Sequence, residues 1–153
     1  MEGISLAGIS GHSYDLVTLL IGVNNQYRGL TLEEYQNEFE ELLNQSLQFA
    51  GGNCARLIVL SIPDWGVTPF AKGRPISVEK IAQEIDQFNL ISQTISKQKK
   101  VNYLNITQDY RRMGGLPENL GEDLLHPNGK IYSRWVISMR EIILSGMNFG
   151  LTS

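Results

Sequence analysis

An acidic and an imidazole side chain lie one turn apart near the carboxyl end of the chain, in the segment Asp123-Leu124-Leu125-His126-Pro127. This spacing permits a hydrogen bond between the carboxylate and the imidazole. A carboxylate so placed fixes the imidazole tautomer and stabilises the imidazolium, as a general base for a serine nucleophile requires. The motif therefore predicts an acid–base pair of Asp123 and His126. The alternative is that Asp123 merely precedes a helix and His126 is a surface turn residue.

Two side-chain amides, Asn24 and Asn25, follow an apolar run that ends at Gly22. An amide at this place can donate hydrogen bonds into a cleft. A donor aimed at a developing oxyanion contributes about 3 to 4 kcal/mol to transition-state stabilisation. Taken alone, the Asn-Asn pair is also typical of a turn, which is the structure predicted for residues 22–29.

The elements that must position these side chains form a repeating pattern. Residues 14–21, 56–62 and 101–106 are apolar runs that predict strands, and the first is apolar enough to be covered on both faces. Amphipathic stretches follow each strand, and Thr31, Ser77 and Asn128 are their expected N-caps. The order β-α-β-α-β-α predicts one α/β domain spanning residues 1–153, a three-layer α/β/α sandwich with a parallel, flavodoxin-like sheet.

Ligands of such sheets bind beyond the carboxyl ends of the strands. This rule places residues 22–29, 63–70 and 107–126 on one functional rim. Trp65 and Phe70 are expected to line a substrate pocket there together with Asn25, although aromatic packing against the sheet is the alternative for the two rings. Tyr110 belongs to the same rim and has the same two alternatives. Arg111 and Arg112 could bind a carboxylate or phosphate on a substrate, but they are expected to be solvated.

Composition excludes several classes of function. The chain of 153 residues has a net charge of -3, so it lacks the positive field of a nucleic-acid-binding protein. No apolar run is long enough for a membrane span, and the first residues do not resemble an export signal. Cys54 is the single cysteine, and with two histidines a structural zinc site is not expected. No metal or organic cofactor is implied, and neither a P-loop nor G-x-G-x-x-G follows a strand.

Read together, Gly22-Val23-Asn24-Asn25 after a strand and Asp123-Leu124-Leu125-His126 before a final helix resemble the SGNH or GDSL-type hydrolases. This superfamily comprises α/β/α esterases and lipases. The resemblance implies cleavage of a small ester, with His126 as general base, Asp123 as its orienting carboxylate and Asn24 as oxyanion donor. The family's G-x-N-D motif has Asn25 in place of its Asp here, which removes a charge but keeps the donor position.

The family's nucleophile, in a G-D-S motif at the end of an earlier strand, has no counterpart upstream of Asn24. Thirteen residues precede the first strand, whereas a parallel crossover alone needs about a dozen. The domain is therefore expected to be amino-terminally incomplete relative to the family, and inactive alone. Ser13, in Gly11-His12-Ser13, is rejected as the nucleophile because it lies at the start of the strand that ends near Asn24, about 26 Å from the rim.

A second function, of another class, follows from the same strand. With strands in chain order, the run at 14–21 lies at the edge of the sheet, and an apolar edge associates with other chains. The alternative to an esterase is thus a catalytically silent α/β binding or assembly module. Such a module would use this edge for self-association or for recognition of a partner by strand addition.

Overall fold

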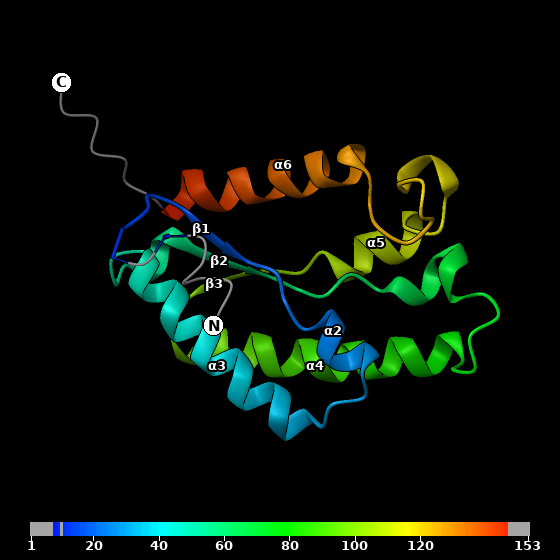
Figure 1. Ribbon diagram of the computed structural model, residues 1–153. Helices are drawn as coiled ribbons and strands as arrows, with labels where there is room; N and C mark the ends of the chain where they lie inside the picture. The colour runs from blue at the N-terminus through cyan, green and yellow to red at the C-terminus, as the bar shows by residue number, and fades with distance from the viewer. Residues whose placement is uncertain (1–7, 10, 147–153) are drawn as a thin grey trace.

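The computed structural model describes residues 8–9 and 11–146, and it is organised around a short parallel sheet (Figure 1). Its strands lie side by side in the order β1-β2-β3. Val17 is in register with Leu57, and Ile58 with Asn102. The α/β fold with a parallel sheet, predicted from the sequence, is confirmed. The strands are β1 (Val17–Leu19), β2 (Leu57–Leu60) and β3 (Asn102–Leu104).

Long helices cover both faces of the sheet. In Figure 1, α3 and α4 lie below the strands and α6 lies above them, which gives the three layers. Shorter helices occupy the connections. The α-helices are α2 (Val23–Tyr27), α3 (Leu32–Phe49), α4 (Val78–Gln98), α5 (Thr107–Met113) and α6 (Gly129–Gly146). The 3-10 helices are η1 (Cys54–Arg56), η2 (Trp65–Val67), η3 (Pro69–Ala71) and η4 (Pro117–Asn119).

The predicted caps begin the three long helices. Thr31 and Glu34 form a reciprocal capping box at α3, and the Ser77 hydroxyl accepts from the backbone N–H of Lys80 at α4. At α6 the Asn128 side chain accepts from the backbone N–H of Lys130. Each of these bonds satisfies an amide that the first helical turn leaves without a partner.

The strand β2 separates two cores because successive side chains of a strand point to opposite faces. Leu57 and Val59 join the core between the sheet and helices α3 and α4. Ile58 and Leu60 join the core between the sheet and helices α5 and α6. All four are buried. Burying each such side chain contributes roughly 1.5–3 kcal/mol, so the central strand anchors both helical layers.

The prediction that the first strand is covered on both faces is wrong. Leu16 and Leu20 are 40% and 39% exposed, and of the strand itself only Leu19 is buried. Among the described residues, β1 pairs with β2 alone and forms the edge of the sheet. The apolar run correctly predicts a strand. At the edge of the sheet, however, the neighbouring elements leave the side chains of Leu16 and Leu20 partly exposed.

Two segments predicted as irregular are helical. Residues 23–27 form α2 instead of a turn, and residues 107–113 form α5 within the predicted rim segment. Neither helix has a side-chain hydrogen bond at its N-cap, which is Gly22 for α2 and Ile106 for α5. The usual sequence signal for a helix start is thus missing from both.

Candidate active site

The loop between η4 and α6 holds Asp123 and His126 as a closed unit. One carboxylate oxygen of Asp123, Oδ1, accepts from the backbone N–H groups of Leu125 (3.0 Å) and His126 (2.9 Å). The other, Oδ2, lies 2.5 Å from Nδ1 of the His126 ring. Gly121 closes the loop by donating its N–H to the His126 carbonyl at 2.8 Å. The acid–base pair suggested by the sequence is thus in hydrogen-bond geometry.

The charge state of this pair follows from its hydrogen bonds. The imidazole of His126, followed by the two backbone N–H donors, lowers the pKa of Asp123 to about 2. At neutral pH the carboxylate is therefore ionised and accepts the Nδ1 proton. The other ring nitrogen, Nε2, is then left as the basic atom.

Acid titration should report this arrangement. We expect the Asp123 carboxyl signal in carbon NMR to titrate near pH 2, well below its usual 3.8. Because the folded-state pKa is the lower one, the stabilisation is present above pH 3.8 and lost as the pH falls through about 2. His126→Ala should raise the midpoint of Asp123. Asp109 is the control, because its pKa is lowered chiefly by Arg112, and its titration midpoint should not change in that variant. A shift of both carboxyl midpoints would contradict the assignment of the low pKa of Asp123 to His126.

Asn24 reaches the site on α2, whose entry depends on a glycine. Gly22 precedes the helix with φ +114°, a region that L side chains rarely adopt. A Cβ there would lie 2.7 Å from Cδ1 of Ile62 and 2.8 Å from the ring of Tyr35. The side chains packed against Gly22 thus fix the direction in which the chain turns toward Asn24.

Gly22→Ala should consequently destabilise the protein by about 2 kcal/mol or more, from backbone strain and overpacking together. Gly29→Ala is the matched control, because Gly29 also has a positive φ of 72° but meets no atom within 4 Å. We expect only about 1 kcal/mol there. Urea unfolding of both variants measures the difference, and equal losses would show that the close contacts at Gly22 do not matter.

The amide of Asn25 is directed elsewhere. Its Nδ2 donates to Glu38 on α3 at 2.6 Å, and Asn25 does not line the cavity that contains Asn24. The substrate contact suggested for Asn25 has no support in this geometry. Adjacent residues on a helix point in different directions, which explains why the two amides separate.

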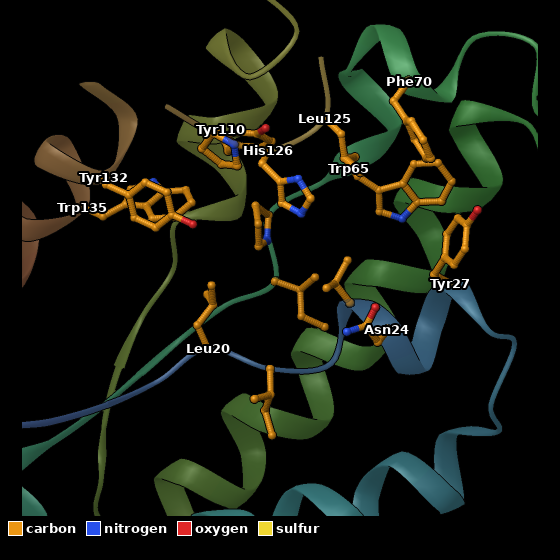
Figure 2. Close-up of a pocket in the computed structure, with 15 residues that line it drawn as sticks. Leu20, Asn24, Tyr27, Trp65, Phe70, Tyr110, Leu125, His126, Tyr132 and Trp135 are labelled. Carbon is orange, nitrogen blue, oxygen red and sulfur yellow. The ribbon is translucent and has the colours of Figure 1, made fainter. Parts of the chain in front are cut away.

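The predicted catalytic residues Asn24 and His126 line one cavity of about 330 Å³, shown in Figure 2. Leu20 and Ile21, just beyond β1, line it together with Ile62. Aromatic rings form two walls around His126. These rings are Tyr27, Trp65 and Phe70 on one side and Tyr110, Tyr132 and Trp135 on the other.

The first wall contains both aromatic residues predicted to contact substrate. The Trp65 ring centroid lies 5.4 Å from that of Tyr27 and 6.1 Å from that of Phe70, with steep interplanar angles. Edge contacts of this kind stabilise aromatic clusters beyond simple burial. Trp65 is itself only 6% exposed, so it both packs in the core and faces the cavity.

Sequence reasoning missed most of the second wall. Trp135 lies on α6, outside the three segments that the sequence places on the rim, yet it is both buried and part of the cavity lining. Tyr132 stands three residues earlier, one turn along α6, and its ring centroid lies 5.0 Å from that of Trp135. That spacing was visible in the sequence, but nothing there indicated that α6 borders the rim.

The cavity lining is almost free of charge. Apart from His126, no lining residue among those the structure describes is acidic or basic. Burial raises the pKa of Tyr110 to about 12, so its phenol stays neutral. The same lining contains no Ser, Thr or Cys, and hence no hydroxyl or thiol nucleophile of the usual kind. Ser13 lies beside Gly51, next to the C-terminal end of α3.

The expectation that Arg111 is solvated is wrong. Its Nε lies 2.7 Å from Oδ2 of Asp64, whose side chain is 1% exposed, and its Nη2 lies 3.0 Å from Oδ1 of Asp86. Burial opposes the charged guanidinium, but hydrogen bonds to the two carboxylates outweigh this effect and raise the pKa of Arg111. Arg111 therefore fastens the loop that begins at Asp64 to the helices α4 and α5.

In the ranges 8–9 and 11–146, no three His, Cys, Asp or Glu side chains gather where they could hold a metal ion. Within the same ranges, no helix combines the length and apolarity needed to cross a lipid bilayer.

Comparison with solved structures defines the class of fold. The chain aligns with LAE5, an alpha/beta hydrolase enzyme from the metagenome of Lake Arreo, Spain, at a TM-score of 0.64 and 15% identity, covering 93% of this chain and 65% of that one. It aligns with a mutant of Axe2, an acetyl-xylooligosaccharide esterase from Geobacillus, at a TM-score of 0.64 and 15% identity, covering 99% and 70%. A lipase/acylhydrolase from Enterococcus faecalis gives a TM-score of 0.57 at 18% identity, covering 86% and 62%.

These likenesses establish an α/β fold shared with the three structures, and the chain spans about two thirds of the length of each structure. No curated protein matches the sequence. The family is given by the sequence itself: residues 4–134 match the GDSL-like Lipase/Acylhydrolase family, and the chain belongs to it. The resemblance seen in the two short motifs is therefore confirmed.

Proposed function

We propose that this chain carries the acid–base and oxyanion part of an acyl-hydrolase site for small neutral esters. The observation that supports the proposal most is that the Asp123-paired His126 and the amide of Asn24 border one apolar cavity. Membership of the lipase/acylhydrolase family agrees with ester hydrolysis.

The steps that these residues would perform are those of acyl transfer to a hydroxyl. Nε2 of His126 removes the proton of the attacking hydroxyl as the new C–O bond forms, while Asp123 stabilises the imidazolium. The carbonyl oxygen becomes an oxyanion and accepts a hydrogen bond from Nδ2 of Asn24. His126 then returns the proton to the leaving alcohol oxygen as the ester C–O bond breaks, and water repeats the sequence.

The attacking hydroxyl is the part that the described cavity lacks. Because no Ser, Thr or Cys lines it, we infer that the nucleophile comes from a segment outside this lining, and that the chain alone does not turn over esters. The 71% exposure of the His126 side chain fits a base that meets its partner on the surface.

The uncharged walls indicate the kind of substrate. A carboxylate placed among Trp65, Phe70 and Trp135 would lose its hydration without gaining an ionic partner. We expect N-benzylacetamide, an uncleavable neutral analogue of a benzyl ester, to bind at least about tenfold more tightly than N-acetylglycine. Isothermal titration calorimetry measures both, with Trp65→Ala as the variant that weakens the neutral ligand. Stronger binding of the acid would refute the neutral-ester assignment.

The exposed edge at β1 supports a second candidate, an assembly module that associates through this strand. Leu16 and Leu20 present apolar surface beside β1, which among residues 8–9 and 11–146 pairs with β2 on one side only, and an apolar edge of this kind templates strand addition. Sedimentation distinguishes the candidates: concentration-dependent dimers of defined stoichiometry favour the module, and a monomer argues against it.

A further inference from the structure

The helix that carries Asn24 is too short to hold its own orientation. α2 has five residues, and no side chain caps its N-terminus. Helices of this length are unstable by themselves because nucleation fixes several residues for few hydrogen bonds. The aim of the Asn24 amide must therefore be set by contacts between α2 and its neighbours.

One buried carboxamide makes the decisive contacts. Gln26 is 3% exposed, and its Oε1 accepts a hydrogen bond from the indole Nε1 of Trp65 at 2.8 Å. Its Nε2 donates to Oε2 of Glu84 on α4 at 2.8 Å. A single side chain thus joins α2, the aromatic wall of the cavity and the longest helix.

The chemistry of this junction explains why an amide occupies it. The side chain must accept from the indole and donate to the carboxylate, and a neutral amide does both. On α4, Glu84 and its ion-pair partner Lys80, at 3.8 Å, are the charged groups at the contact, whereas η2 presents only the uncharged indole. An apolar residue at position 26 would leave the buried indole N–H without an acceptor and would remove one of the two partners of Glu84.

We propose that Gln26 is a positioning residue, which sets the aim of the Asn24 amide by locking α2 to Trp65 and Glu84. One residue, Asn25, separates this anchor from the proposed oxyanion donor Asn24, so displacement of one moves the other. A bound ligand that displaces Trp65 would then also displace Asn24, through the hydrogen bond between Trp65 and Gln26. The inference rests on the proposed function only in taking Asn24 as the oxyanion donor.

The first test compares two substitutions on α2 in the full chain, without ligand. Gln26→Ala should accelerate hydrogen exchange of the Trp65 indole N–H about tenfold, and it should shift and broaden the Asn24 side-chain amide signal in NMR. Asn25→Ala is the matched control, because it removes only the exposed bond to Glu38. We expect it to leave both signals unchanged.

The second test exchanges the amide of Gln26 and the carboxylate of Glu84 between the two positions. It also tests the proposal if Gln26→Ala does not fold. Gln26→Glu sets two carboxylates against each other, so both signals should be disturbed at pH 7 and recover as the pH falls below about 5 and one carboxylate takes a proton. Adding Glu84→Gln should restore both signals at pH 7, since an amide and a carboxylate then face each other again.

Either of two results would overturn the proposal. The first is an Asn24 signal that stays unchanged while the Trp65 indole loses protection. The second is a Gln26→Glu, Glu84→Gln protein that folds but remains disturbed at pH 7. Failure of the proposed function would give a different result, because N-benzylacetamide would then not bind to the wild-type chain. Both tests of Gln26 are made without ligand, so they would still decide its role.

Discussion

Purified alone, the chain should release p-nitrophenol from p-nitrophenyl acetate no faster than an equal concentration of free imidazole does, and a fluorophosphonate probe should label no serine stoichiometrically. The base His126 is in place, but the cavity lining contains no Ser, Thr or Cys for it to activate. Loss of a serine nucleophile removes about six orders of magnitude of turnover in a serine hydrolase, so the expected difference from a complete enzyme is very large.

The measurement needs a complete, active esterase of the same family in parallel, to show that the probe and substrate work. His126→Ala should lower the release rate of this chain by no more than the direct attack of one exposed imidazole on this activated ester contributes, because a base without a serine to activate gives no acyl-enzyme turnover. Mass spectrometry would identify any labelled serine. Stoichiometric labelling of any serine would refute the inference that this chain alone does not turn over esters.

Replacing Arg111 should have the largest effect on stability. Arg111→Met removes the guanidinium that meets Asp64 and Asp86, and it leaves the Asp64 carboxylate buried without its ionic partner. Breaking one side of such a buried pair costs about 3 to 5 kcal/mol. Because Trp65 follows Asp64 directly, we also expect the aromatic wall of the cavity to loosen.

Arg112 provides a control one residue further along the same helix. Its side chain is 76% exposed and pairs with Asp109 at 2.8 Å. An exposed pair of this kind contributes less than about 1 kcal/mol, so Arg112→Met should be nearly neutral. Urea unfolding of both variants, with intrinsic tryptophan fluorescence as the signal, measures the contrast. Similar losses at the two positions would contradict the role given to Arg111.

The parts of the fold that depend on local signals were predictable. The caps Thr31, Ser77 and Asn128 each bond a backbone amide within three residues, so the signal and its partner lie in the same short segment. The bond between Asp123 and His126 is equally local. Family membership adds the expectation that Asn24 faces the same rim.

The features that were missed depend on partners distant in sequence. Arg111 meets Asp64, 47 residues earlier, and Gln26 meets Glu84, 58 residues later. Neither partnership leaves a trace in local composition. The helix α2 is similar: its anchors lie on other elements, so its sequence alone reads as a turn.

The central claim is that the amide of Asn24 and the imidazole of His126 serve one cleft. Titration of the nitrogen-labelled chain with N-benzylacetamide, followed by NMR at the Asn24 side-chain amide and the His126 ring, tests it most directly. The account predicts that both signals shift along one binding curve with the same midpoint. A ligand that moves one signal to saturation and leaves the other untouched would contradict it.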